Sequence, residues 1–135
     1  MNYLLDTNIV SYILKNNASV NSKLQQVTRQ GDEVFISCIT YYEVKRGLLA
    51  LNARRQLAEF ETFFQKYEVL YLGNIEIIET ACKIHADLKA KGTPIQDADV
   101  LIAATAITRG LILVSNDSDM VRVEEIDLEN WVDES

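Results

Sequence analysis

The sequence predicts a single α/β domain over residues 1–135, with a central parallel sheet of about four to five strands flanked by helices. Three observations indicate this architecture. Short apolar runs typical of strands alternate with longer segments that have helical periodicity. Turn residues separate the two kinds of segment, and no repeat or linker interrupts the chain. Alternating strands and helices imply right-handed crossovers, which place the strands parallel to one another.

The first half of the chain supplies two predicted strands and four predicted helices. The opening run Met1–Leu5 is a strand that stops at an acid, Asp6, where an amphipathic pattern starts at once. Glu33–Ser37 has the β-branched and aromatic content of a second strand. Apolar residues at helical spacing predict the four helices. Their approximate ranges are Ile9 to Asn17, Ser19 to Gln30, Thr40 to Leu51, and Asn52, as the cap, to Gln65.

The second half completes the sheet. Val69–Leu72 is a third strand, and Leu111–Val114 is an apolar run that suits a central parallel strand covered on both faces. Two helices are predicted between them, Ile75–Lys91 and Asp97–Arg109, and each is followed by a glycine that can end it. The tail Val123–Trp131 is expected to add an edge strand and a docked aromatic side chain.

The composition is that of a compact protein without a membrane span. Of the 135 residues, 48% are apolar and 24% are charged, which is typical of a globular domain. The longest apolar stretch, roughly Val100 to Ile107, is far shorter than the roughly 18 residues that a membrane span needs. Because the N-terminus also lacks the basic region of a signal peptide, we expect a cytoplasmic protein.

Several reactive side chains favour structural roles. Cys38 and Cys82 stand in apolar surroundings without the spacing of a metal site, so we expect buried, reduced thiols. His85 lies on the expected apolar face of its helix, which favours packing in the core or at an interface over catalysis. The net charge of −7 argues against binding duplex nucleic acid by charge alone. It does not exclude a nucleic-acid enzyme, because cations bound by acids bring positive charge to the phosphate.

Four acids are predicted at one edge of the sheet. Asp6 ends the first strand and Asp117 follows the strand Leu111–Val114, and parallel strands end at a common edge. Glu43 and Asp99 lie in the first turns of helices that can point at the same crevice. Ligands and metals in open α/β sheets are usually bound there.

Each acid also has a structural explanation. Asp6 is a natural N-cap for the first helix, and Asp117 suits a turn or the cap of a short helix. Thr40–Glu43 matches a capping box, in which the Glu side chain folds back onto the amide of the cap residue. Asp97 is the natural cap of its helix, so Asp99 is surplus to local structure. The chain therefore supplies more acids than its caps and turns require.

Clustered carboxylates favour metal-dependent chemistry. Four such groups repel one another, and some take up protons unless a cation neutralises them. Oxygen ligands favour the hard cations Mg²⁺ and Mn²⁺ over zinc. With no catalytic Ser or Cys evident, the site supports metal-assisted attack of water on phosphate. Lys45 and Arg46 are candidate contacts for a phosphate backbone, with solvated surface charges as the alternative.

The order of these motifs resembles PIN-domain ribonucleases, and in particular the VapC toxins of type II toxin–antitoxin modules. The similarity runs nearly the whole length of the chain. It is carried by five segments, which are Leu4–Asn8, Ile39–Gly47, Pro94–Ala104, Gly110–Asp117 and Arg122–Trp131. Each segment alone is a weak signal, but five in order at family-like spacing are specific.

The resemblance implies a PIN-like fold and a set of site residues. By position, the metal-binding and catalytic acids would be Asp6, Glu43, Asp99 and Asp117. Asp6 and Asp99 would be the principal metal ligands, with Asp117 completing the site. Glu43 would position or deprotonate water, or bind a second ion, while Thr7 and Asn116 would support the ligands. The family cuts RNA with Mg²⁺ or Mn²⁺, usually works as a dimer, and is inhibited by a VapB-type antitoxin. RNA would then be bound by a few local contacts, for instance Lys15, Lys45 and Arg46.

Three other interpretations remain. A PIN-type nuclease of RNA processing outside a toxin module would have the same site, and an antitoxin-like reading frame beside the gene would separate the two. In a non-catalytic binding module the acids would serve as caps, and Mn²⁺ affinity that is lost on acid substitution would count against it. A phosphatase of the haloacid-dehalogenase type is disfavoured, because it needs a second Asp where Asn8 stands.

Overall fold

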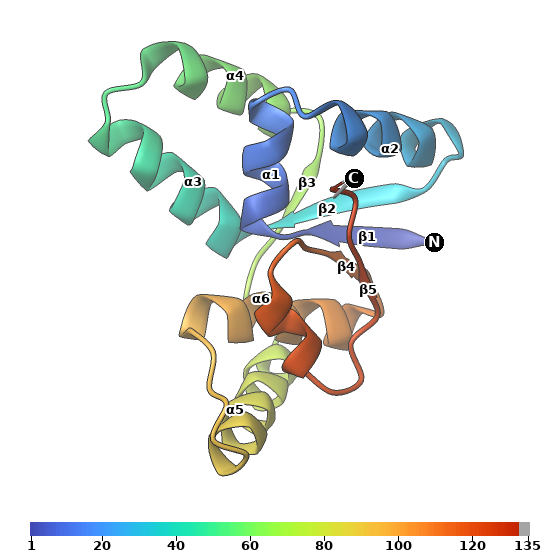
Figure 1. The fold of residues 1–135 in the computed structure, drawn as a ribbon, viewed down its shortest axis with the longest axis vertical. Coiled ribbons are helices and arrows are strands. Elements are labelled where there is room, and N and C mark those ends of the chain that lie inside the picture. The colour runs from blue at the N-terminus through green and yellow to red at the C-terminus, as the bar shows by residue number, and fades with distance from the viewer. Residues whose placement is uncertain (133–135) are drawn as a thin grey trace.

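The computed structural model describes residues 1–132, which form a five-stranded sheet between two layers of helices (Figure 1). The strands are β1 (Asn2–Leu5), β2 (Glu33–Ser37), β3 (Glu68–Leu70), β4 (Ile112–Val114) and β5 (Leu128–Glu129). Every neighbouring pair is parallel, in the order β3-β2-β1-β4-β5. The predicted α/β class and parallel sheet are confirmed.

The helices cover both faces of the sheet. They are α1 (Thr7–Leu14), α2 (Ala18–Arg29), α3 (Cys38–Ala50), α4 (Arg54–Phe64), α5 (Ile75–Ala90), α6 (Asp97–Arg109) and the short 3₁₀ helix η1 (Ser118–Arg122). Figure 1 shows α1 to α4 on one side of the sheet and α5 and α6 on the other. None of the helices in residues 1–132 has the length and apolar character that crossing a lipid bilayer requires.

The core is divided by the sheet, and β1 contributes to both halves. Tyr3 and Leu5 pack with buried side chains of α1, α2 and α4, among them the fully buried Phe60. Leu4, between them, points to the opposite face and packs with α5 and α6. Alternate side chains of a strand lie on opposite faces, so β1 is covered on both sides. This explains why its sequence is a continuous apolar run.

The strand order creates a switch point beside β1. From β1 the chain adds β2 and then β3 on one side, whereas β4 and β5 lie on the other side. The ends of β1 and β4 are adjacent, because the Asp6 amide donates to the Val114 carbonyl at 2.9 Å. In open α/β sheets, the crevice at the carboxyl ends of strands flanking such a point is the usual ligand site. Asp6 and the segment after β4 therefore line the expected position.

Helix α3 begins earlier than predicted. The Ser37 side chain accepts a hydrogen bond from the Ile39 amide and caps the helix, so the predicted start at Thr40 is wrong. Thr40 lies inside α3 and is fully buried. The capping box between Thr40 and Glu43 is therefore not formed, and the Glu43 carboxylate makes other contacts.

Two further predicted caps are wrong. Asn52 adopts a left-handed conformation, with φ of 51°, after the end of α3, and α4 begins without a side-chain cap. Gln96 occupies the N-cap position of α6, so Asp97 is the first residue of that helix. The predicted end of α6 is confirmed, because Gly110 adopts φ of 65°, a conformation that glycine accepts without strain.

The buried face of α5 is rotated relative to the prediction. It consists of Ile77, Ala81, Ile84 and Leu88. His85 follows this stripe and is exposed, so it does not pack in the core of this chain, and the alternative that it packs at an interface stays a prediction. Cys82 is also exposed and Cys38 is half-buried, which corrects the prediction of buried thiols. Both are free thiols, as expected.

The C-terminal segment confirms the predicted edge strand and docked aromatic. Strand β5 pairs with β4 at the edge of the sheet. The indole of Trp131 is buried against the ring of Tyr3, with their centroids 5.4 Å apart in an edge-to-face arrangement. The Trp131 carbonyl accepts a hydrogen bond from the Ser19 hydroxyl, which ties this segment to α2.

Candidate active site

Asp6 is the most buried acid of the site, with 2% of its surface exposed. Its Oδ1 accepts a hydrogen bond from the Thr7 amide at 2.8 Å, and its Oδ2 accepts one from Ser115 Oγ at 2.7 Å. Burial raises the pKa of Asp6, and these two hydrogen bonds oppose that rise. The nearby carboxylates of Asp117 and Glu43 raise the pKa further. Asp6 is therefore a helix cap and a member of an acidic cluster at the same time.

Glu43 is positioned by the start of α1. Thr7 Oγ1 donates to Glu43 Oε1 at 2.8 Å and lies 3.1 Å from Thr40 Oγ1. Because Thr7 donates to the carboxylate, the Thr40 hydroxyl is the donor in the second contact. On the solvent side, Arg46 Nη2 lies 3.9 Å from Glu43 Oε2. One carboxylate oxygen is thus fixed by hydrogen bonding, and the other faces an exposed cation.

Asp99 lies in the first turn of α6 and is half-buried. Burial raises the pKa of Asp99 to about 6, and the charges of Asp6, Asp117 and Glu43 contribute in that order. Asp119 adds a smaller effect. The four predicted acids come from four separate segments of the chain, and their carboxylates lie close enough to repel one another. This repulsion is the electrostatic feature that defines the site.

The segment after β4 brings Asp117 to the cluster. Asp117 caps η1 by accepting from the Asp119 amide at 2.9 Å, and its own amide donates to Ser115 Oγ at 3.0 Å. Ser115 is buried and bridges Asp117 to Asp6. The sequence prediction gave this serine no role, although a serine between an apolar strand and an acid is the signal that could have identified it.

Asn116 makes contacts different from those expected of a residue that supports the acids. Its Nδ2 donates to the Tyr12 hydroxyl at 3.2 Å, and its Oδ1 accepts from Asn130 Nδ2 at 2.9 Å. Its backbone amide donates to Asn8 Oδ1. Asn116 therefore connects α1 to the C-terminal segment beside the site, whereas Thr7 contacts an acid directly.

The three cations expected to contact RNA lie in different surroundings. Arg46 is exposed and borders Glu43. Lys45 points to α4, where its Nζ lies 3.1 Å from Glu61 Oε1 and donates to the Tyr41 hydroxyl at 3.0 Å. Lys15 is exposed at the end of α1, whereas Asp6 lies at its beginning. Of the three cations, Arg46 is the one paired with an acid of the cluster.

The donor set suits a hard divalent cation. All four acids offer carboxylate oxygens, which Mg²⁺ and Mn²⁺ prefer, and a bound cation relieves the repulsion that raises the pKa values of Asp6 and Asp99. Within residues 1–132, no three His, Cys, Asp or Glu side chains are arranged to bind a metal ion as they stand. The charge distribution therefore fits a cation, although the carboxylates do not form a closed set of ligands.

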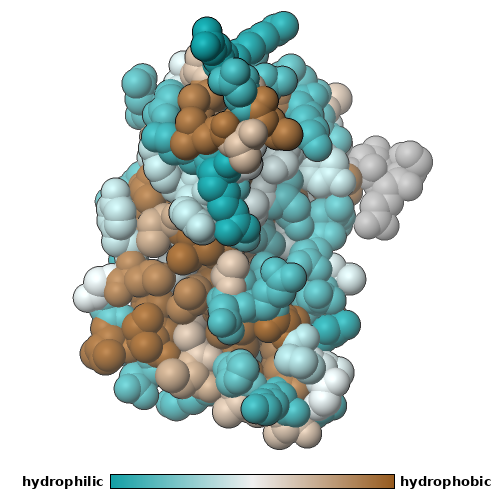
Figure 2. Space-filling view, turned by 90° about the vertical axis from the view of Figure 1, so that its left-hand side faces the viewer, coloured by the Kyte–Doolittle hydropathy of each residue, from teal (hydrophilic) through white to brown (hydrophobic). Residues whose placement is uncertain are grey.

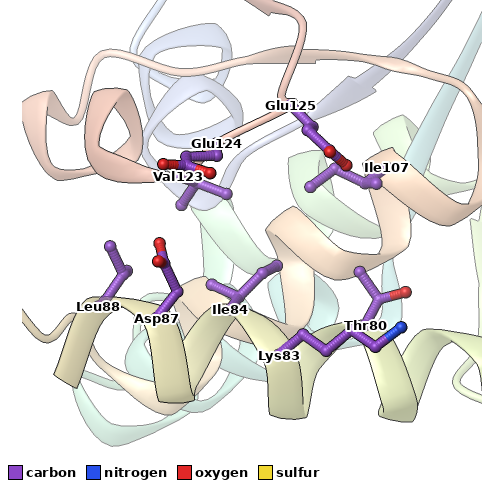
Figure 3. A pocket seen from close by; sticks show the side chains of 9 residues that line it. All are labelled: Thr80, Lys83, Ile84, Asp87, Leu88, Ile107, Val123, Glu124 and Glu125. Atoms are coloured by element: carbon purple, nitrogen blue, oxygen red, sulfur yellow. The ribbon is translucent and has the colours of Figure 1, made fainter. Parts of the chain in front are cut away.

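A separate pocket of about 330 Å³ lies away from these acids (Figure 3). Its walls are α5, the end of α6 and the segment after η1, and its lining includes none of the four acids. Figure 3 shows Glu124 across the opening from Asp87 of α5, and Glu125 beside Ile107. Lys91 ties Asp87 to Glu124 at one end of the same region. These contacts join α5 to the chain after η1.

Comparison with known proteins identifies related sequences. Residues 3–126 match the PIN domain family. Over 134 residues, the chain is 33% identical to the tRNA(fMet)-specific endonuclease VapC of Salmonella typhimurium, and the match covers 97% of this chain and 98% of that protein. It is 29% identical over 133 residues to Ribonuclease VapC1 of Haemophilus influenzae, with the same coverage.

Comparison with solved structures gives a consistent result. The fold matches a chain in the crystal structure of VapBC2 from Rickettsia felis bound to a DNA fragment from their promoter. The TM-score is 0.89 at 26% sequence identity, and the match covers 97% of this chain and 99% of that chain. The topology described above is therefore shared along almost the entire length.

Proposed function

The chain belongs to the PIN domain family, and on this basis we propose that it is a divalent-metal-dependent endoribonuclease, the toxin component of a type II toxin–antitoxin module. The observation that carries the proposal is the convergence of four acids from separate segments at the switch point of the sheet. Caps and turns do not account for it, because Asp99 caps no helix and Glu43 forms no capping box. The names of the relatives support ribonuclease activity.

We assign the acids distinct roles. Asp6 and Asp99 would be the principal ligands of Mg²⁺ or Mn²⁺, and Asp117 would complete the site. Bound there, the cation would supply positive charge that offsets the scissile phosphate and favours ionisation of water. Glu43 would accept the proton of the attacking water at Oε2, because Thr7 already donates to its Oε1. Thr7 and Ser115 would keep the carboxylates of Glu43 and Asp6 in position.

The partners of the protein follow from the same reasoning. The solved relative from Rickettsia felis is a VapBC complex, which supports a VapB-type antitoxin as the partner of this chain. The proposal also includes an RNA substrate, a homodimeric state and a cytoplasmic location. Expression of the chain with and without the product of an adjacent small reading frame tests the toxin assignment. If the chain arrests growth and the second product relieves the arrest, the result supports a toxin module. If the chain causes no growth arrest, the result favours a PIN nuclease of RNA processing.

Substitution of Asp6 by Asn tests the enzymatic proposal. Asn keeps an oxygen that can accept from the Thr7 amide, so the cap and the fold are retained. We expect RNA cleavage to fall at least about 100-fold, as when a group that stabilises transition-state charge is lost. Mn²⁺ affinity measured by calorimetry should fall in parallel. A folded Asp6→Asn protein that cleaves RNA at the wild-type rate would overturn the assignment.

Asp97→Asn is the matched control. Asp97 stands two residues before Asp99 in the same first turn, but it is exposed. Its substitution removes the same charge from the same helix terminus. Cleavage and Mn²⁺ affinity close to wild type are expected, whereas Asp99→Asn should behave like Asp6→Asn.

A further inference from the structure

Helix α3 presents an exposed aromatic side chain beside the acidic cluster. Tyr42 directly precedes Glu43 in the sequence, and its side chain is 59% exposed. One turn later, the Arg46 guanidinium lies over this ring, with Cζ 4.9 Å from the ring centroid. Arg46 Nη2 is also 3.9 Å from Glu43 Oε2. Tyr42 and Arg46 thus form a continuous surface that ends at the carboxylate proposed to activate water.

The neighbouring pair on the same helix has a structural role. The Tyr41 ring packs edge-to-face on Phe64, with centroids 4.9 Å apart, and Lys45 bonds to both the Tyr41 hydroxyl and Glu61. These contacts bind α3 to α4. Within residues 1–132, Tyr42 and Arg46 make no corresponding contact with another helix, so packing does not explain their position.

The face that carries α3 and the beginning of α6 is the one turned to the viewer in Figure 2. Hydrophobic side chains gather there in two areas, one near the top at the level of α3 and α4 and a larger one in the lower half. Hydrophilic and weakly polar side chains occupy the band between them. The exposed apolar side chains of Leu49, in the last turn of α3, and Leu51, its C-cap residue, lie at the far end of the helix from Glu43. Tyr42 directly precedes Glu43 on α3, and the Arg46 guanidinium lies beside the Glu43 carboxylate.

Because the protein is negatively charged overall, its binding to RNA must depend on favourable contacts at particular side chains. With a net charge of −7 and four clustered acids, the chain as a whole repels a polyanion. Proteins that bind single-stranded nucleic acid combine cations with aromatic rings on which unpaired bases stack. An exposed tyrosine with a stacked guanidinium supplies both groups. A duplex cannot use the ring in this way, because its bases are already stacked on one another.

We propose that Tyr42 and Arg46 form a binding platform for an unpaired nucleotide of the RNA substrate, with the base stacked on the Tyr42 ring and Arg46 contacting a phosphate beside the cleavage site. The inference rests on the proposed ribonuclease function and deepens it.

Binding of RNA to a cleavage-inactive protein tests the platform. In the Asp6→Asn background, fluorescence anisotropy compares a labelled single-stranded oligoribonucleotide with a duplex of the same sequence. Tyr42→Leu keeps an apolar side chain but removes the ring, and single-strand affinity should fall on the order of 10-fold. Tyr42→Phe keeps the ring and should stay within about 2-fold of the parent. Arg46→Gln should weaken binding and reduce its dependence on salt concentration.

Arg55→Gln is the control for the loss of charge. Arg55 is an exposed arginine on α4 that pairs with Glu59 one turn away, just as Arg46 pairs within α3. Its substitution should leave RNA affinity unchanged. With the catalytic acids intact, Tyr42→Leu should raise KM for single-stranded RNA and leave kcat nearly unchanged, because the ring would bind the base equally in the ground state and the transition state and takes no part in breaking the bond.

The outcomes separate the platform from the function on which it rests. Equal affinities for Tyr42→Leu and Tyr42→Phe, or an equal loss for single-stranded and duplex RNA, would overturn the platform. The platform would also be overturned if Tyr42→Leu changed self-association, measured by sedimentation, and left RNA affinity unchanged. That result would assign the ring to a protein interface. Failure of the wild-type protein to cut any RNA would instead overturn the proposed function, since the binding assay requires no cleavage.

Discussion

Ser115 Oγ donates to Asp6 Oδ2 at 2.7 Å and accepts a hydrogen bond from the Asp117 amide at 3.0 Å. One hydroxyl therefore connects the end of β1 to the segment after β4, across the switch point of the sheet. Its bond to Asp6 lowers the pKa of that carboxyl and opposes the effect of burial. Ser115 thus favours the ionised form of the most buried acid in the site.

Replacement of Ser115 tests this relationship. Ser115→Ala leaves the buried Asp6 carboxylate without one of its two donors, which should cost about 1 to 3 kcal/mol of unfolding free energy at pH 7. Mn²⁺ affinity should fall about 10-fold, as for other residues that orient metal ligands. Ser115→Thr keeps the hydroxyl and should restore most of both quantities, measured by urea denaturation and calorimetry. Equal Mn²⁺ affinities for the Ala and Thr variants would contradict the positioning role.

The raised pKa of Asp99 predicts a pH-dependent stability of the metal-free protein. The folded state binds a proton on the Asp99 carboxyl more tightly than the unfolded state does. The stabilisation of the folded state by this proton is therefore fully present below about pH 4. It is lost as the pH rises through about 6, the pKa of Asp99 in the folded state. Allowing for solvent screening of a half-buried group, the decline should be about 1 kcal/mol.

Asp99→Asn provides the measurement for this decline. Urea denaturation in a chelating buffer at pH 4.5 and pH 7 should show a smaller loss of stability for this variant than for the wild type. Part of the loss should remain, because burial also raises the pKa of Asp6. Asp97→Asn should leave the difference between the two pH values unchanged. If Asp99→Asn lost as much unfolding free energy as the wild type between pH 4.5 and pH 7, or more, the raised pKa of Asp99 would be contradicted.

Phe60 is expected to dominate the packing of α4. Its side chain is fully buried, and its ring centroid lies 4.4 Å from that of Phe64 and 5.2 Å from that of Tyr41. Phe60→Ala should lower the unfolding free energy by about 3 to 5 kcal/mol, because it leaves a cavity. Leu51→Ala, at an exposed position, should stay within about 0.5 kcal/mol of wild type in the same urea titration. Similar losses for both variants would contradict this account of the core.

The fold was predictable because its signals are local and redundant. The strand Glu33–Ser37 and the helix Asp97–Arg109 have the predicted bounds, since each is marked by apolar composition and by polar or glycine boundaries. His85 was misplaced because successive helix residues are about 100° apart, so a one-residue error in the apolar stripe exposes a residue predicted to be buried. The cap of α3 was misplaced because two nearby hydroxyl residues compete for it, and Ser37 forms the hydrogen bond.

The proximity of Asp6 and Asp117 was predictable from the rule that parallel strands end at one edge. Asp6 and Asp117 follow β1 and β4, which are neighbours in the sheet. The hydrogen bonds among them were not predictable, because Ser115 and Asp6 are far apart in the sequence and meet only after the sheet has formed. The sequence match to a capping box likewise concealed the contact between Glu43 and Thr7, which depends on the packing of α1 against α3.

Thr7 offers a test of how the Glu43 carboxylate is oriented. Its hydroxyl donates to Glu43 Oε1 at 2.8 Å and accepts from Thr40, whereas its backbone amide contributes to the cap at Asp6. Thr7→Val preserves the shape of the side chain and the backbone amide but removes the hydroxyl. RNA cleavage should fall about 10-fold or more, since Glu43 loses the donor that orients it. Thr7→Ser keeps the hydroxyl and should retain most of the activity.

Substitution of the buried Thr40 distinguishes an effect on the orientation of the Glu43 carboxylate from an effect on the stability of the fold. In Thr7→Val the Thr40 hydroxyl loses its contact with Thr7 Oγ1, which should cost about 1 kcal/mol of unfolding free energy. In the double variant Thr7→Val/Thr40→Val both hydroxyls are absent, so the unfolding free energy should return toward wild type. The cleavage rate should stay low, because Glu43 still lacks its donor. Recovery of cleavage together with stability in the double variant would show that Thr7 acts through folding and not through Glu43.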